Sequence, residues 1–282
     1  MITDFEQLTR KLRDLNRRVR VAAVCPRDHS SEAALTQAHK EGWAEPIVID
    51  HDDQPTAARE AVAAVRRGEA DVLMKGLVSS DVLLRAVLNK EDGLLSPGHV
   101  LTHIAVAQMS GYHKLVAYSD AAVIPYPTQE QRSRQIAYLV ALCHSLGIAE
   151  PRVSLIHCSE KADARHFPFT EGYAQLAAQA REGVYGRCMV DGPLDVKTSM
   201  CAESMRVKGI QSPIGGEADA LVFPDIEAAN VFHKTITLLA GARIAAVLQG
   251  PEVPVVMPSR GDDAQSKYYS LALAALQSVN NQ

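Results

Sequence analysis

The stretch VRVAAVCPRDHSSEAALTQAHKEGWAEPIVIDH, from Val19 to His51, decides the fold. A valine-rich apolar run is followed by an amphipathic segment and then by a second run rich in isoleucine and valine. Short β-branched runs separated by helical patterns are typical of βαβ units around a mostly parallel sheet. The alternation continues toward the C-terminus and predicts about ten strands. We therefore expect an α/β protein with an α/β/α arrangement and mostly parallel sheets.

The length of the chain suggests two domains. It has 282 residues, 47% of them hydrophobic, which is enough to bury two cores. The segment IPYPTQEQ, Ile124 to Gln131, is the best boundary, because its prolines stop a strand and Thr128 can cap a helix. A second crossing is expected just past Pro258. We thus expect residues 1–125 plus 259–282 to form the first α/β domain and residues 126–258 the second, with an active-site cleft between them.

Composition argues against several classes of protein. The net charge is -4, and the 29 basic and 33 acidic residues are interspersed, so neither nucleic acid nor a membrane surface is an expected partner. The N-terminal residues 1–18 form an amphipathic pattern rather than a signal peptide, and no apolar run has the length of a membrane span. We expect a cytoplasmic protein. The cysteines are scattered without CxxC pairs, which argues against structural zinc.

Common cofactor motifs are missing from the sequence. It contains no GxGxxG after the first strand, no GxxxxGK[ST] and no GxSxG, so a standard dinucleotide, ATP or hydrolase site has no support. His99 and His103 are four residues apart, but the surrounding VLTHIAVAQM is strand-like and the glutamate of HExxH is absent. We interpret them as ordinary histidines near the sheet ends and predict no metal site.

The segment DVLMKGLVSSDVLLRAVL, residues 71–88, predicts a strand, a turn and a helix. Lys75 and Gly76 form the turn, Ser79 or Ser80 begins the helix, and Arg85 lies on it. Free backbone N–H groups and positive charge at such a turn suit a phosphate. A solvated Lys75 and a serine that only caps the helix explain the same residues equally well.

The segment ALVFPDIEAANVFHK, residues 220–234, has the same strand, turn and helix pattern. Asp225 is the natural N-cap. Asn230 and Lys234 then lie on one face of the helix, four residues apart, and are candidates for contacts with a substrate.

A third such turn lies in VPVVMPSRGDDAQSKYYSLALAAL, residues 253–276. We expect the last helix to begin near Asp262, which forms a capping-box pattern with Gln265. Ser259, Arg260 and Asp263 have no such structural role. Arg260 offers a donor fork for phosphate oxygens, the Ser259 hydroxyl and Gly261 amide can add hydrogen bonds, and a nearby carboxylate is a candidate general base.

These stretches resemble the phosphate acetyl/butyryltransferase family, and its butyryl branch in particular. The resemblance runs from about residue 71 to the C-terminus and is most specific in FPDIEAANVFHK and PSRGDDAQSK. It implies the reversible reaction of acyl-CoA with phosphate to give acyl phosphate and coenzyme A. It also implies the two-domain fold of the isocitrate and isopropylmalate dehydrogenase group, and a homodimer or higher homo-oligomer, without a nicotinamide or an obligatory metal.

The resemblance also implies roles for individual residues. Ser259 and Arg260 would hold phosphate and stabilise the tetrahedral intermediate. Lys75, Ser79 and Arg85 correspond to a region that lines the coenzyme cleft. Acetyl-specific members place an aspartate about two helical turns after the serine, where this chain has Ser266. This difference favours the butyryl branch and leaves Asp263 as the candidate base.

The substitution at Ser266 also supports an alternative, a non-catalytic or altered relative that binds CoA or a phosphorylated metabolite. The preferred acyl chain length is not encoded in any motif, because one methylene group contributes only about 1 to 3 kcal/mol and depends on pocket shape. The physiological direction of the reaction is not encoded either.

Overall fold

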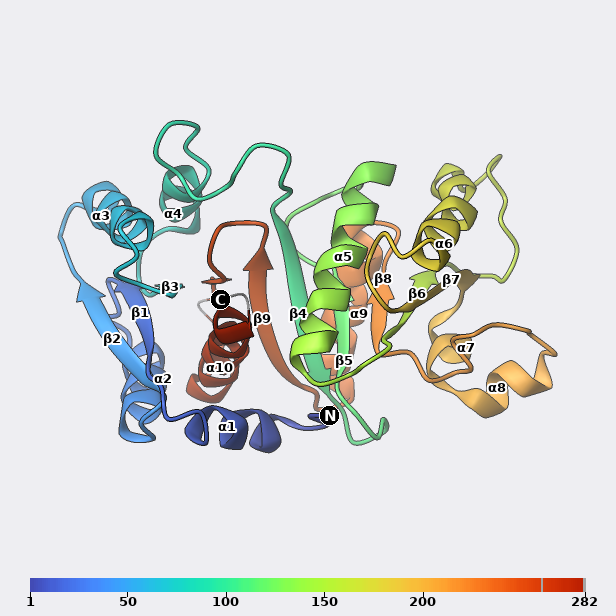
Figure 1. Ribbon diagram of the computed structural model, residues 1–282, viewed down its shortest axis with the longest axis horizontal. Helices are drawn as coiled ribbons and strands as arrows, with labels where there is room; N and C mark the ends of the chain where they lie inside the picture. Colours follow the sequence, from blue (N-terminus) through green and yellow to red (C-terminus); the bar gives the residue numbers. More distant parts are fainter. Residues whose placement is uncertain (260, 281–282) are drawn as a thin grey trace. The chain divides into compact units, whose positions relative to one another are not determined.

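The structure is a computed structural model that describes residues 1–259 and 261–280 (Figure 1). The chain divides into two compact units. One, the terminal unit, consists of Asp4–Leu101 and Ile244–Gln282, and the other, the central unit, consists of Met1–Thr3 and Thr102–Arg243. Both contain strands and helices, and the α/β class expected from the sequence is confirmed.

The sheet of the terminal unit has the hydrogen-bonded order β2-β1-β3-β10-β9. Its strands are β1 (Val19–Val24), β2 (Ala44–Ile49), β3 (Val72–Lys75), β10 (Val255–Val256) and β9 (Arg243–Gln249). The first four run parallel, and β9 pairs antiparallel with β10. The opening stretch therefore forms the βαβ unit that its pattern predicts.

Helices lie on both faces of this sheet (Figure 1). The helices α3 (Gln54–Arg66) and α4 (Ser80–Val87) contact each other, while α10 (Ala264–Asn280) contacts both α1 (Phe5–Arg13) and α2 (His29–Lys40). Every residue of α10 from Lys267 to Ser278 is buried. A helix that is buried on all sides needs small and apolar residues throughout, which the YYSLALAAL run supplies.

The central unit has the strand order β4-β5-β8-β6-β7. The strands β4 (Thr102–Gln108) and β5 (Val116–Ser119) form an antiparallel pair, and β8 (Ala220–Val222), β6 (Arg152–Ile156) and β7 (Met189–Leu194) continue in parallel from β5. Its helices are α5 (Gln129–Ser145), α6 (Tyr173–Arg181), α7 (Val196–Met200), α8 (Ala202–Val207) and α9 (Ile226–Leu239), with a 3-10 turn at Pro168–Gly172.

Two helix starts in this unit follow the sequence prediction. Thr128 caps α5 in a full capping box with Gln131, and the Asp225 carboxylate accepts the Ala228 N–H at 2.8 Å at the start of α9. Both predictions are confirmed. A cap can be predicted from sequence because it depends on residues only three positions apart.

The unit limits differ from the expected domain limits, which were residues 1–125 with 259–282 and residues 126–258. Pairing of β4 with β5, and of β5 with β8, keeps Thr102 onward in the central unit. Pairing of β10 with β3 and β9 returns the chain to the terminal unit after Arg243. The prolines of IPYPTQEQ therefore end a loop inside the central unit.

Candidate functional site

Three polar turns meet at one edge of the terminal unit's sheet. The strands β1, β3 and β10 are parallel neighbours, with Val24 opposite Lys75 and Met74 opposite Val256. The described segments that follow them, residues 25–28, 76–79, 257–259 and 261–263, therefore share the carboxyl edge of the sheet. This edge is where ligands usually bind in open α/β sheets.

The turn after β3 is packed tightly against the end of β1. A Cβ atom on Gly76 would lie 2.3 Å from the Cys25 carbonyl oxygen, so only glycine fits there. Lys75 is the last residue of β3, is only 4% exposed, and its Nζ donates to the Gly76 carbonyl at 3.2 Å. The alternative of a solvated Lys75 is therefore wrong, because the neighbouring strands enclose the side chain.

Ser79 begins α4, and its main-chain N–H donates to the Gln54 Oε1 at 3.0 Å. Ser79 is the N-cap residue of α4, as the sequence allowed, although within the described residues its hydroxyl makes no capping hydrogen bond. Arg85 is exposed in the last turn of α4. At 1.5 Å per residue it lies about 9 Å along the helix from Ser79. Lys75 and Ser79 thus lie in one turn, and Arg85 lies beyond it.

The turn after β10 contains Ser259, Gly261, Asp262 and Asp263. The Ser259 N–H donates to the Asp262 carboxylate at 2.8 Å, and the Gly261 N–H donates to the Ser259 hydroxyl at 3.3 Å. Ser259 and Gly261 are both exposed. Arg260, for which contacts with phosphate were predicted, lies outside the described residues.

Asp263, rather than Asp262, is the cap of α10. The Asp263 carboxylate accepts the Ser266 N–H at 2.7 Å, and its carbonyl accepts the Lys267 N–H at 3.1 Å. The interpretation of Asp262 as the cap is wrong, because the helix begins one residue later and Asp262 instead closes the turn onto Ser259. Asp263 thus has the capping role that the sequence suggested for Asp262.

Sequence reasoning missed an ion pair at this edge, between the buried Lys267 and the partly exposed Asp28. The Lys267 Nζ of α10 donates to the Asp28 carboxylate at 2.6 Å and to the Ser31 hydroxyl at 3.0 Å, and Lys267 is only 4% exposed. Asp28 follows β1 and caps α2. The available signal was a lysine within a helix that is otherwise apolar, since a buried cation needs a partner.

The charge of Asp28 is fixed by its surroundings. Burial alone would raise the pKa of this carboxyl, but hydrogen bonds from Lys267, Ser30 and Ser31 outweigh burial and hold the pKa far below its ordinary value. Asp28 therefore stays ionised at neutral pH and is unsuited to act as a general base.

The other two predicted contacts, Asn230 and Lys234, belong to the central unit. Both lie on α9 and are exposed. The Asn230 side-chain amide donates to the Ala121 carbonyl at 3.0 Å, which joins α9 to the turn after β5. Asn230 thus has a structural contact that the sequence did not reveal, whereas Lys234 remains a surface cation.

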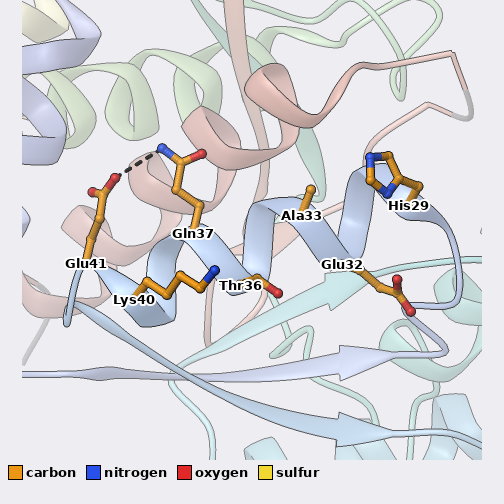
Figure 2. Close-up of a pocket in the computed structure, with 7 residues that line it drawn as sticks. All are labelled: His29, Glu32, Ala33, Thr36, Gln37, Lys40 and Glu41. Carbon is orange, nitrogen blue, oxygen red and sulfur yellow. Dashed lines mark hydrogen bonds between the residues drawn. The ribbon is translucent and has the colours of Figure 1, made fainter.

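Figure 2 shows a separate pocket along α2, lined by His29 in the first turn of the helix and by residues onward to Glu41 at its end. Its lining comes from this one segment, and Gln37 donates to Glu41 within it at 3.1 Å. The pocket lies along a helix flank rather than at strand ends, so we do not assign the reaction to it.

Neither a metal-binding cluster nor a membrane-spanning helix is found in the described residues. Across residues 1–259 and 261–280, no group of three or more His, Cys, Asp or Glu side chains is placed to hold a metal ion. In the same part of the chain, none of the helices combines the length and apolar character needed to cross a bilayer.

Comparison with known proteins identifies the family. Residues 14–275 match the family described as phosphate acetyl/butaryl transferase. The chain belongs to this family. It is 38% identical to a phosphate butyryltransferase of Clostridium beijerinckii, over 83% of this chain and 77% of that protein. It is 35% identical to a phosphate acetyltransferase of Thermotoga maritima, over 83% and 79% of the two chains.

A solved structure is similar along nearly the whole chain. The branched-chain phosphotransacylase of Enterococcus faecalis matches with a TM-score of 0.84 and 27% identity, covering 92% of this chain and 99% of that one. The expected membership of the phosphate acetyl/butyryltransferase family is thereby confirmed, and the chain is an acyltransferase.

Proposed function

We propose that this phosphate acyltransferase moves a short-chain acyl group, butyryl or one of similar size, between coenzyme A and inorganic phosphate. The names of its relatives support phosphate as the acceptor and an acyl group of two to a few carbons. The structural observation that carries the proposal is the exposed Ser259 turn, at the carboxyl edge of the sheet and the start of α10.

In the proposed reaction a phosphate oxygen attacks the thioester carbonyl carbon, and the carbonyl oxygen becomes negative. The C–S bond then breaks, the acyl phosphate forms, and coenzyme A leaves as a thiolate that takes up a proton. The Ser259 hydroxyl, the Arg260 guanidinium and the Gly261 N–H hold phosphate. Charge-assisted hydrogen bonds from these groups stabilise the oxyanion, and one well-placed donor contributes about 3 to 4 kcal/mol.

The remaining predicted residues are assigned to binding the parts of the substrates that lie farther from the reacting carbon. We assign Lys75, Ser79 and Arg85 to the coenzyme, whose phosphates suit a hydroxyl and cations. Asn230 and Lys234 remain proposed substrate contacts. No obligatory metal or nicotinamide is proposed, so dialysis against a chelator should leave the activity unchanged.

Asp263 remains the proposed base that removes the thiol proton in the reverse direction. Its capping role uses one carboxylate oxygen, and an asparagine caps a helix equally well. Asp263→Asn should therefore keep the melting temperature and lower kcat for acyl-CoA synthesis about 100-fold. An unchanged kcat, measured from acyl phosphate and coenzyme A, would assign Asp263 to capping alone.

We also propose a homo-oligomer in the cytoplasm. Val231, Leu238 and Leu239 lie on one face of α9, and the two leucines are 82% and 78% exposed. Aliphatic side chains gathered on one helix face favour contact with a second copy. Light scattering after size exclusion tests this: Leu238→Lys with Leu239→Lys should shift the mass toward the monomer.

The activity is tested by following free thiol released from a panel of acetyl-, propionyl-, butyryl- and branched acyl-CoA. Release should require phosphate and be fastest for butyryl-CoA or a neighbour in size. Absence of phosphate-dependent release from every member would contradict the proposal. Tight CoA binding without turnover, unchanged in Asp263→Asn, would favour the alternative of a non-catalytic relative, which the serine at position 266 motivates.

A further inference from the structure

Lys267 connects two of the three turns at the carboxyl edge. Its main-chain N–H bonds to the carbonyl of Asp263, the cap of α10, and its side chain bonds to Asp28, the cap of α2. Asp263 ends the turn after β10, and Asp28 ends the turn after β1. One residue thus fixes both turns to each other across the end of β3, which lies between these strands.

The connection is electrostatic as well as geometric. The Oδ2 atom of Asp28 is buried and has no hydrogen-bond partner among the residues that the structure describes. The other oxygen, Oδ1, accepts the Ser31 N–H, the Ser30 hydroxyl and the Lys267 ammonium. Among these donors only Lys267 is a cation, so removing it would leave a partly buried carboxylate without a compensating charge. A buried pair broken on one side strains its surroundings far more than an exposed pair does.

The turn after β10 depends on this anchor. In the described part of the chain, the hydrogen bonds of Ser259, Gly261, Asp262 and Asp263 all lie within the turn and the first turn of α10. The turn therefore moves with the start of α10. Lys267 links that start to the neighbouring turn at the same sheet edge.

We propose that Lys267, through its pair with Asp28, is a positioning residue for phosphate. It sets where the Ser259 turn lies relative to the turns after β1 and β3, without touching the substrate. The proposal rests on the role of Ser259 in holding phosphate, which is part of the proposed function. It predicts a specific defect in the phosphate site and a smaller effect on acyl-CoA.

The chain contains a matched control in the next residue. The Tyr268 hydroxyl donates to the carboxylate of Glu41, which follows the other end of α2. Figure 2 shows Glu41 at the end of the helix opposite His29, which follows Asp28. The two contacts join the same pair of helices about 20 Å apart along α2. Tyr268→Phe removes a hydrogen bond between α10 and α2 but leaves the start of α10 anchored.

The experiment measures kcat and both KM values at 25 °C for wild type, Lys267→Met, Tyr268→Phe and Ser259→Ala. Lys267→Met should raise the KM for phosphate about tenfold or more, as expected for a lost charged hydrogen bond, with less than a threefold change in the KM for butyryl-CoA. Tyr268→Phe should change neither KM. Amide exchange at Gly261 and Ser266 should accelerate in Lys267→Met and stay unchanged in Tyr268→Phe.

The outcomes separate this proposal from the proposed site. If Ser259→Ala leaves the KM for phosphate unchanged, the site assignment fails whatever Lys267 does. If Ser259→Ala raises it and Lys267→Met does not, only the positioning role fails. Equal effects of Lys267→Met and Tyr268→Phe on the KM for phosphate would also overturn it.

Two milder variants apply if Lys267→Met does not fold. Asp28→Asn keeps the helix cap and removes the charge, and should raise the KM for phosphate in the same direction. Lys267→Arg keeps the charge and should recover most of the wild-type KM. An Asp28→Asn enzyme with wild-type phosphate KM and amide exchange would contradict the proposal.

Discussion

The turn after β10 and the turn after β8 are built on the same local plan and differ in what surrounds them. Each follows a parallel strand and ends in an aspartate that caps a long helix, at 2.7 Å for Asp263 and 2.8 Å for Asp225. In the turn after β8, the Pro224 carbonyl accepts from the buried Arg132, and the Ile226 N–H donates to Pro125. The polar groups of this turn are thus hydrogen-bonded to other segments of the protein.

The turn after β10 has the opposite surroundings. Ser259 and Gly261 are exposed and bond only within the turn, among the described residues, while the helix that follows is buried. The turn after β8 and its helix α9 are the reverse case: the turn is packed against other segments, and much of the helix surface is exposed. A rigid buried helix that presents an exposed polar turn is the arrangement that a preorganised anion site needs. The caps alone therefore do not distinguish the two turns, and the difference in their surroundings is the reason that the Ser259 turn is proposed as the phosphate site.

The largest expected effect tests this difference through charge. Arg260→Gln should lower kcat/KM for phosphate about 100- to 1000-fold, because a donor to the developing oxyanion is lost. Arg260→Lys keeps the positive charge but not the forked pair of donors. Its kcat/KM for phosphate should lie between those of the wild type and Arg260→Gln. The control is Glu227→Gln, an exposed charge in the first turn of α9. It should keep at least about half of the wild-type kcat/KM, and a loss comparable to that of Arg260→Gln would contradict the contrast between the turns.

Lowering the pH should weaken the packing of α9 but not that of α10. α9 is held partly through a neutral histidine: burial, with smaller contributions from His103 and Lys234, lowers the pKa of His233 to about 4. The Tyr118 hydroxyl lies 2.6 Å from the His233 Nδ1. The ordinary pKa of histidine is about 6.5, so the unfolded chain takes up this proton first. Stability is complete above pH 6.5 and falls as the pH drops toward 4.

The expected loss from His233 between pH 8 and pH 5 is about 2 kcal/mol in the free energy of unfolding. The Lys267 and Asp28 pair that holds α10 should be unaffected in this range, because the pKa of Asp28 lies well below the ordinary value for aspartate. Urea unfolding of wild type and His233→Gln at both pH values measures the difference. A His233→Gln variant with the same pH slope as wild type would show that His233 is not the group responsible.

The sequence predicted local features well and long-range ones poorly. Thr128 and Asp225 were identified as caps because capping is decided within three residues. The choice between Asp262 and Asp263 failed, since each has a polar residue three positions on and the spacing does not reveal that Asp262 accepts from Ser259 instead. The pair of Lys267 and Asp28 joins residues 239 positions apart, so no local pattern reveals it.

The same limit applies to the division of the chain. The unit limits depend on the pairing of β4 with β5 and of β9 with β10, whereas the prolines near Ile124 report only a local break. The buried state of Lys75 also depends on neighbouring strands rather than on its own segment. The polar turn after β10 was recognisable because its residue types are unusual, but its role as an exposed end of a buried helix required the fold.

The smallest expected effect compares the two caps directly. Asp225→Ala and Asp263→Ala each remove one capping hydrogen bond and should each lower the free energy of unfolding by about 1 kcal/mol. Their effects on phosphate should differ: the turn before Asp225 is also held by Arg132 and Pro125, whereas the turn before Asp263 is held by its own hydrogen bonds. Only Asp263→Ala should raise the KM for phosphate, by about threefold to tenfold, and this rise is separate from the loss of kcat expected when the proposed base is removed. An equal rise in both variants, measured well below their melting temperatures, would mean that the surroundings of the two turns do not distinguish them.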